Sequence, residues 1–270
     1  MMTPVLIALT LALAADDAPN IVRRAVEREL AATGQPRDYT YRFREVARSL
    51  ATDGSVRKTD IKTFEVLILY GKQFTRLIER DGHPLPEPDA RKEQARFDRE
   101  VQRRARLIEP QRAKEDQEDR EEDRKRRDFI RQIPDLYDFT LEGDETIEGR
   151  EAWVISARPR KDAKPRGLIA GNLSKLHGRL WIDKAEARWI RVQADALRSI
   201  NFGWFLGSVG HGSRITFEQT RVADDVWLPR RVAGRLIARL VVKRLNLESE
   251  TTYFDYRRFQ TDSRILSGAQ

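Results

Sequence analysis

Apolar residues recur at a spacing near 3.6 between residues 20 and 33, which predicts an amphipathic helix. We expect the helix to begin at Asn20, whose side chain can cap it, and to end before Gly34 and Pro36. The apolar positions of this helix are Ile21, Val22, Ala25, Val26 and Leu30.

After residue 38 the spacing changes to two, the period of a half-buried strand. The first such segment alternates aromatic residues on one face with polar residues on the other: Tyr39, Tyr41 and Phe43 against Thr40, Arg42 and Arg44. Turns are expected at Asp53-Gly54, about Gly71-Lys72 and at Asp81-Gly82. Three consecutive antiparallel strands are therefore predicted, and the second contains Phe64, Val66 and Ile68.

Strand patterns return from residue 138 and continue to about residue 259. Turns are expected near Glu148-Gly149, Lys184-Ala185 and Asp224-Asp225. The last strand should place Thr252, Phe254 and Tyr256 on one face. Short turns make sequence neighbours spatial neighbours, so we expect about nine or ten strands in one antiparallel meander.

Residues 87–132 interrupt the strands with a highly charged segment. The segment holds 15 Lys or Arg and 14 Asp or Glu, with a thin apolar seam of Phe97, Val101 and Ala105. Opposite charges four residues apart favour helix, and Pro110 is expected to divide the segment into two helices. Because its charges nearly cancel, we expect a solvated helical arm that adds little to the core, and not a nucleic-acid site.

The composition narrows the function classes. The 270 residues carry a formal net charge of +8 and include no Cys. A disulfide framework, a Cys-based zinc site, a thiol nucleophile and lipid attachment through an N-terminal Cys are thereby excluded. Residues 5–14 form an apolar run too short to span a bilayer, which needs about 20 residues. Followed by Asp16 and Asp17, it predicts a signal peptide over residues 1–15, hence a soluble periplasmic protein.

Signals of catalysis are weak. The histidines His83, His177 and His211 lie far apart with no ligand-like spacing, and no nucleophile elbow occurs. Arginines that alternate with aromatic residues follow from half-exposed strands and do not by themselves indicate nucleic-acid binding. We therefore expect no enzyme activity, no metal, no cofactor and no nucleic-acid partner.

One stretch, residues 200–213, carries no charged side chain and combines large apolar residues with glycine. It lacks the Lys-Ser/Thr of a phosphate loop. Burying each aromatic group there is worth about 2–3 kcal/mol. Three interpretations remain: an apolar plug over a ligand-binding concavity, ordinary core, or a loop that touches a membrane. The residues concerned are Phe202, Trp204, Phe205 and Leu206.

Three motifs, "GREAWVISARPR", "HGRLWIDKAEARWIRVQADA" and "VWLPRRV", resemble those of LolA/LolB-type lipoprotein-sorting proteins. The resemblance covers residues 138–260 by motif and residues 20–80 by layout. It implies an α+β fold: a strongly curved antiparallel β half-barrel with an N-terminal helix, whose apolar concave face is covered by helices. Residues 20–265 would form this single domain, with 87–132 as a charged helical insertion longer than the family's covering helices.

The resemblance implies a periplasmic, non-enzymatic binding protein for a lipid or an acylated protein, with transient membrane contact. The implied apolar site contains Tyr39, Tyr41, Phe43, Phe64, Val66, Ile68, Phe202, Trp204, Phe205 and Leu206. Two alternatives stay open. One is a structural or interaction protein of the cell envelope that docks a partner through residues 87–132. The other is an envelope enzyme acting on lipid or glycan, for which no residue signature exists.

Overall fold

The structure, a computed structural model, describes residues 17–32, 35–173, 175–197, 200–201, 208–240 and 243–259. Within them the helices are α1 (Ala18–Ala31), the 3-10 helix η1 (Gln35–Asp38), α2 (Glu87–Ala105), α3 (Glu109–Leu136) and α4 (Leu168–Leu173). The strands are β1 (Tyr39–Leu50), β2 (Val56–Leu69), β3 (Lys72–Arg80), β4 (His83–Pro84), β5 (Tyr137–Ile147), β6 (Arg150–Pro159), β7 (Leu176–Asp183), β8 (Trp189–Ala196), β9 (Ile200–Asn201), β10 (Ser208–Val209), β11 (Arg214–Ala223), β12 (Val226–Leu240) and β13 (Lys243–Arg258).

Helix α1 forms as predicted but begins earlier. The cap is Asp17 and not Asn20: the Asp17 carboxylate accepts a hydrogen bond of 2.9 Å from the Asn20 backbone N–H. This bond satisfies one of the N–H groups that every helix start leaves without an intrahelical partner. The apolar stripe faces the sheet, with Ile21, Val22 and Ala25 fully buried.

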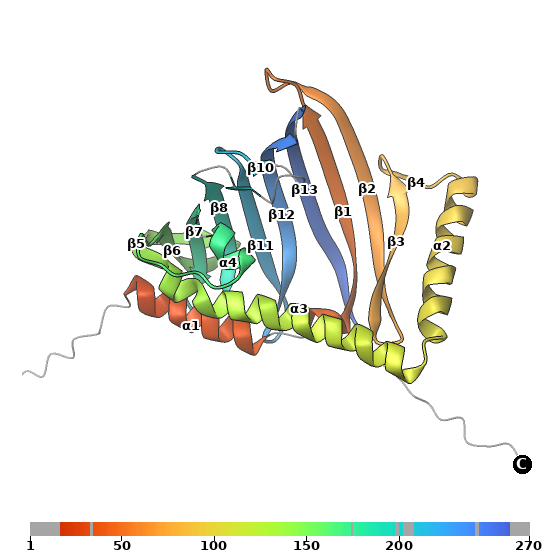
Figure 1. Cartoon of the computed structure of the whole chain (residues 1–270), viewed down its shortest axis with the longest axis horizontal. Coiled ribbons are helices and arrows are strands. Elements are labelled where there is room, and N and C mark those ends of the chain that lie inside the picture. The colour runs from red at the N-terminus through yellow and green to blue at the C-terminus, as the bar shows by residue number, and fades with distance from the viewer. Residues whose placement is uncertain are drawn as a thin grey trace, which may run out of the picture.

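A single antiparallel sheet of thirteen strands accounts for the strands of the described residues. Its order is β4-β3-β2-β1-β13-β12-β11-β8-β7-β6-β5, with β9 and β10 attached beside β12. The sheet is curved and open, so the predicted half-barrel is confirmed (Figure 1). More strands occur than predicted because β4, β9 and β10 have two residues each, too few to show a period.

The prediction of one continuous meander is wrong at one ladder. Strand β1 pairs with β13, from Tyr39 opposite Arg258 to Leu50 opposite Asn246. Two meanders, β1 to β4 and β5 to β13, are thereby joined edge to edge. The backbone N–H and C=O groups on the free side of β1 need partners, and the last strand of the chain supplies them.

Several predicted turns occur as tight hairpins. At Asp81-Gly82 and Glu148-Gly149 both residues have positive φ, 53° and 80° in the first pair and 51° and 79° in the second. Two left-handed residues are characteristic of the type I′ turn, whose twist matches that of the flanking strands. Glycine adopts this conformation without steric cost.

The register separates two faces of the sheet, since directly paired residues of antiparallel strands point to the same side. Phe43 pairs with Tyr253, and Val192 pairs with Phe217. Pairing through β11, β12 and β13 places these residues on one face, which we call the inner face. Helix α1 packs on the inner face, in a core cluster with Ile155 and other side chains of β6, β7 and β8.

The expected face of the last strand is corrected by a bulge. Thr252 and Phe254 pair with arginines of β1 on the outer face. Tyr256 instead contacts Tyr41 on the inner face, at a ring-centroid distance of 5.3 Å. Asp255, the residue before it, has a φ of 56°, and the pairing register of β1 shifts opposite this residue. This bulge reverses the alternation of side chains between the two faces of the sheet. A single bulged residue was enough to move the side chain to the other face.

Helix α2 covers the edge of the sheet at β3. Arg96 Nη2 donates to the Thr75 carbonyl at 2.8 Å, and the Leu77 N–H donates to the Glu93 carboxylate at 2.9 Å. Unpaired backbone groups along an edge strand invite association with other chains. Strand β4 pairs with only two residues of β3. Beyond it, side chains of α2 form hydrogen bonds with the backbone groups of β3.

Helix α3 runs from the β3 edge of the sheet to the β5 edge, past the lower ends of the strands and beside α1 (Figure 1). At its first half Lys72 forms ion pairs with Asp116 and Asp119, and Arg37 pairs with Asp123 at 2.7 Å. At its end α3 passes directly into β5. The predicted pair of helices is confirmed, and the second connects the two edges of the half-barrel.

The buried stripe of α1 gives a stability prediction. Ile21→Ala should lower the free energy of unfolding by about 2–5 kcal/mol, because it leaves a cavity against the sheet. Glu27→Ala, on the exposed side of the same helix, should change it by less than about 0.5 kcal/mol. Urea titration measures both. Equal midpoints would mean that α1 is not part of the cooperative unit.

The arm gives a second prediction. In α2 only Phe97 and Arg104 are buried, and the Phe97 ring packs edge to face on Phe74 with centroids 6.1 Å apart. Phe97→Ala should therefore free α2 from the sheet without unfolding it. Hydrogen exchange followed by mass spectrometry should show lost protection over residues 87–105 and unchanged protection in β1 and β13. Loss across the whole sheet would make α2 an integral part of the core.

Candidate functional site

A cavity of about 370 Å³ lies on the inner face, under the last turns of α3. Its wall is apolar apart from a few side chains. Helix α3 contributes Phe129, Ile130 and Ile133. The sheet contributes larger side chains that include Tyr137, Phe139, Leu180, Trp189, Val192 and Phe217.

The roof of the cavity is a short apolar patch at the end of a charged helix. Phe129, Ile130 and Ile133 follow a long run of Asp, Glu, Lys and Arg. Phe129 lies four residues before Ile133 and Ile130 three residues before it, and both spacings bring side chains together on one side of a helix. Ile130 and Ile133 pack against the core cluster that holds α1 on the sheet. The same contacts therefore anchor α3 and close the cavity.

The floor of the cavity is hollow because three small residues lie in one row. Ala157, Gly178 and Ala194 are directly paired across β6, β7 and β8, and all three line the cavity. A Cβ atom on Gly178 would lie 3.3 Å from the Ala157 Cβ, so the strands leave little room for a larger residue there. Larger neighbours on both sides of the row complete the walls.

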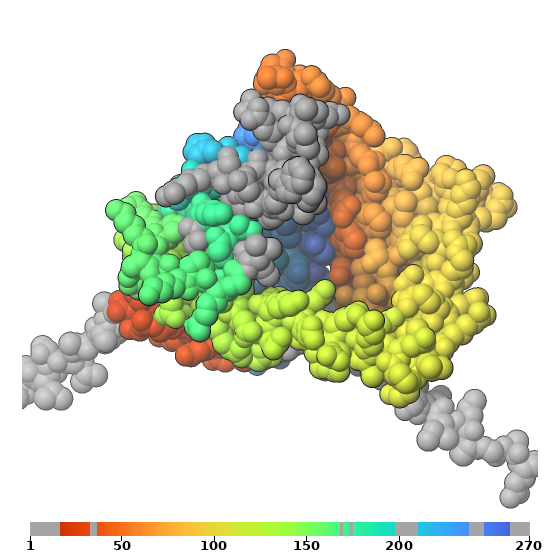
Figure 2. Space-filling view, in the orientation of Figure 1, coloured from red at the N-terminus to blue at the C-terminus, as the bar shows by residue number. Residues whose placement is uncertain are grey.

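Figure 2 shows that the inner side of the molecule is hollowed above α3. The blue surface of β12 and β13 and the red-orange surface of β1 are seen at the base of this hollow. The described part of the inner face is therefore not completely covered by α1 and α3.

One end of the cavity carries polar groups. Glu29, in the last turn of α1, lines it together with Gln219 of β11. Burial raises the pKa of the Glu29 carboxyl above its ordinary value of 4.5. The charges of Arg188 and Arg126 and a hydrogen bond from Gln219 act in the opposite direction and only partly offset it. Burial also raises the pKa of the Tyr137 hydroxyl to about 12.

The predicted site residues that the structure describes lie together on the inner face of β1 and β2. This place is separate from the cavity under α3. Tyr39, Val66 and Ile68 are buried, whereas Tyr41, Phe43 and Phe64 are partly exposed. The aromatic residues among them lie beside Tyr253 and Tyr256 of β13. We call this set the aromatic belt: Tyr39, Tyr41, Phe43, Phe64, Tyr253 and Tyr256. The rings of Phe43 and Phe64 stack with centroids 4.8 Å apart, and the Tyr256 hydroxyl donates to the Pro229 carbonyl at 2.5 Å.

The predicted plug lies outside the described residues. Phe202, Trp204, Phe205 and Leu206 belong to residues 202–207, which the structure does not describe. The predicted signal peptide, residues 1–15, is likewise outside. Both stay predictions from the sequence.

Of the predicted residues that the structure describes, none lines the cavity under α3. The sequence did carry a signal for its roof, because Phe129, Ile130 and Ile133 end the charged run at helical spacing. The sequence carried no signal for the floor of the cavity. The small residues of three strands become one row only after the strands pair in a particular register.

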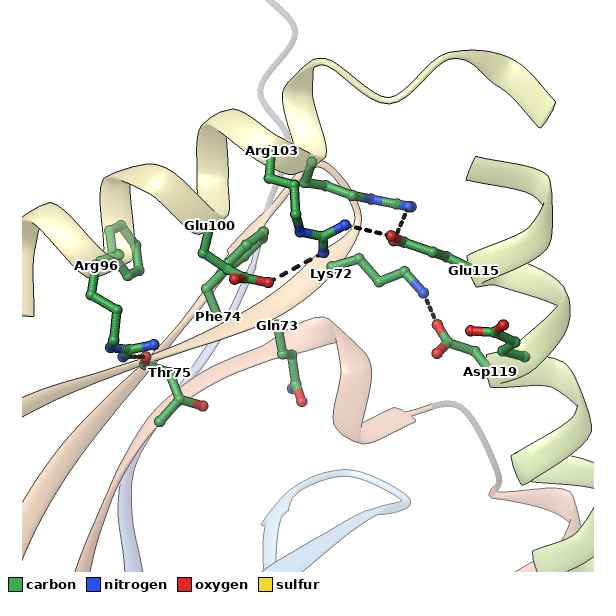
Figure 3. A pocket seen from close by; sticks show the side chains of 12 residues that line it. Lys72, Gln73, Phe74, Thr75, Arg96, Glu100, Arg103, Glu115 and Asp119 are labelled. Atoms are coloured by element: carbon green, nitrogen blue, oxygen red, sulfur yellow. Dashed lines mark hydrogen bonds and ion pairs between the residues drawn. The ribbon is translucent and has the colours of Figure 1, made fainter. Parts of the chain in front are cut away.

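A second hollow of about 460 Å³, the charged crevice between β3, α2 and α3, is lined by side chains that form ion pairs with one another (Figure 3). Lys72 points to Asp119, and Arg103 bonds Glu115 at 2.7 Å. The deeply buried Arg104 of α2 donates to two carboxylates of α3, to Glu115 at 2.6 Å and to Asp116 at 3.0 Å. These contacts fix the corner between α2 and α3, so we assign the crevice a structural role.

In the part of the chain that the structure describes, no three His, Asp or Glu side chains are arranged to hold a metal ion. The helices there also include none with the length and apolarity needed to span a membrane.

Comparisons with known proteins give matches among solved structures alone. No family model and no curated protein matches the chain. A DUF1329 family protein from Desulfovibrio piger is 12% identical, with a TM-score of 0.35, over 90% of this chain and 94% of that one. A putative outer membrane lipoprotein-sorting protein domain from Vibrio parahaemolyticus is 12% identical, with a TM-score of 0.32, over 89% and 94%. A LolA superfamily protein from Nitrosomonas europaea is 12% identical, with a TM-score of 0.32, over 91% and 94%.

The last two structures bear names of the group that the sequence motifs resemble. Because these TM-scores are low, the function of the chain is argued below from its own contacts.

The Glu29 carboxyl gives a pH prediction. With a raised folded-state pKa, the folded protein holds this proton more tightly than the unfolded chain. The contribution of this bound proton to the free energy of unfolding is complete below the pKa that Glu29 has in the unfolded chain. It is lost as the pH rises through the pKa that Glu29 has in the folded protein. Glu29→Gln should therefore gain stability relative to wild type between about pH 4 and about pH 7. Urea midpoints at both pH values measure this, with Glu27→Gln as control; a pH-independent difference would contradict it.

Proposed function

We propose that the protein is a non-enzymatic periplasmic binding protein that holds the acyl chain of a lipid or an acylated protein in the cavity under α3. The observation that carries the proposal is the cavity itself: about 370 Å³ of space with an almost wholly apolar wall. Sites for small molecules are typically mostly apolar and occupy about 300–1,000 Å³.

The construction of the cavity also supports a binding role. A wall of large apolar side chains around a row of small residues leaves open a space that one larger residue could have filled, as at Ala194. Filled cores are more stable than hollow ones. An unfilled apolar space under a helix therefore has a cost in stability, which a bound acyl chain would offset.

The aromatic belt extends the proposal. Its partly exposed rings lie on the same inner face, so we place there the part of a longer ligand that leaves the cavity. Export through residues 1–15 and brief contact with a membrane during ligand transfer belong to the same proposal. A docking role for the charged segment is less supported, because cations of its crevice already pair with carboxylates of the same segment.

A cavity-filling variant tests the proposal. Ala194 lines the cavity and pairs with Ile215 on the inner face. Ala194→Leu should fill the space and weaken binding of the neutral apolar dye N-phenyl-naphthylamine at least about tenfold, with a stability change below about 1.5 kcal/mol. Fluorescence titration and urea denaturation supply the two measurements.

The matched control is Ala233→Leu, the same change on the outer face, where Ala233 pairs with Thr216 and Glu250. It should bind the dye as wild type does. Absence of dye binding by wild type, or equal binding by both variants and wild type, would refute the proposed site.

A further inference from the structure

Among the described residues that line the cavity, one side chain carries a carboxyl group, which a ligand chain lying among Ile133, Trp189 and Phe217 would meet. That side chain is Glu29, beside Gln219. A carboxylate removed from water is costly unless hydrogen bonds or charges compensate it. It has acceptor sites for about four hydrogen bonds, and the Gln219 amide supplies one. Acceptor capacity therefore remains at the end of an apolar space.

The position of Glu29 in α1 gives a second, independent argument. Glu29 lies in the last turn of the helix, where the helix dipole is negative and disfavours a carboxylate. The same end accepts a cation instead: Arg188 Nη1 donates to the Arg28 carbonyl at 2.6 Å. Proteins break local rules of this kind mainly at functional or strained positions.

Two arginines act on Glu29, yet neither lines the cavity. Arg188 directs its other terminal nitrogen toward the Asp225 carbonyl at 3.4 Å. Arg126 is half exposed and pairs with Asp123 at 3.3 Å. A ligand that enters the cavity therefore meets the carboxyl group and not a guanidinium group.

We propose that the cavity selects ligands whose apolar chain ends in a hydrogen-bond-donating head, an amine or a hydroxyl, over ligands that end in a carboxylate. This inference rests on the proposed function and specifies its ligand class. A donor head completes the hydrogen bonding of Glu29 at the end of the chain. A carboxylate head would bring a second negative charge and further lone pairs to the same place.

The test is displacement of bound N-phenyl-naphthylamine from the full chain by dodecylamine, dodecanol and dodecanoate at neutral pH, each kept monomeric. Dodecylamine should displace the dye at a concentration at least about tenfold below that of dodecanoate, with dodecanol between them. Glu29→Gln should bring the amine and the carboxylate to within about twofold. Glu27→Gln, on the exposed side of the same helix, should keep the wild-type ratio.

The outcomes separate the two proposals. Equal displacement by all three compounds in wild type, or a ratio that Glu29→Gln leaves unchanged, overturns the head-group inference while the proposed function stands. Failure of wild type to bind the dye overturns both. The wild-type comparison needs no variant, so it decides the inference even if Glu29→Gln does not fold.

Discussion

Strand β1 pairs with β13 along its length, and the remaining architecture depends on this ladder. It joins residues from the two ends of the chain, Tyr39 opposite Arg258 at one end and Leu50 opposite Asn246 at the other. Without it the protein would consist of two separate meanders. With it, one curved sheet has a single inner face, and apolar side chains from both meanders must be covered on that face.

The helices cover the inner face unevenly. Helix α1 buries Ile21, Val22 and Ala25 completely against β6, β7 and β8. Helix α3 is held by ion pairs at the β3 edge and by Ile130 and Ile133 near the β5 edge. Its charged middle offers little apolar surface to the strands beneath. The cavity lies where the apolar end of α3 meets the row of small residues in the sheet.

Local features of the fold were predictable from the sequence, and long-range ones were not. Alternation in "DYTYRFREV" and dipeptides such as Asp81-Gly82 depend on neighbouring residues, so the longer strands and the hairpins between them were predicted correctly, whereas β4, β9 and β10 were not. The partner of β1, the bulge at Asp255 and the cavity floor depend on how distant segments pair. Four belt residues, Tyr39, Tyr41, Phe43 and Phe64, were predicted to share a face because they alternate within single strands. Tyr253 and the inner position of Tyr256 were not predicted. The cavity was missed because Ala157, Gly178 and Ala194 are unremarkable until they are neighbours.

Native mass spectrometry of the protein, purified without detergent from the cells that produce it, tests the central claim most directly. If the inner-face cavity holds an acyl chain, wild type should carry an added mass of one lipid or acylated molecule, and Ala194→Leu should lose it while Ala233→Leu keeps it. A bare wild-type mass under conditions that preserve non-covalent complexes, or an added mass retained equally by both variants, would contradict the account.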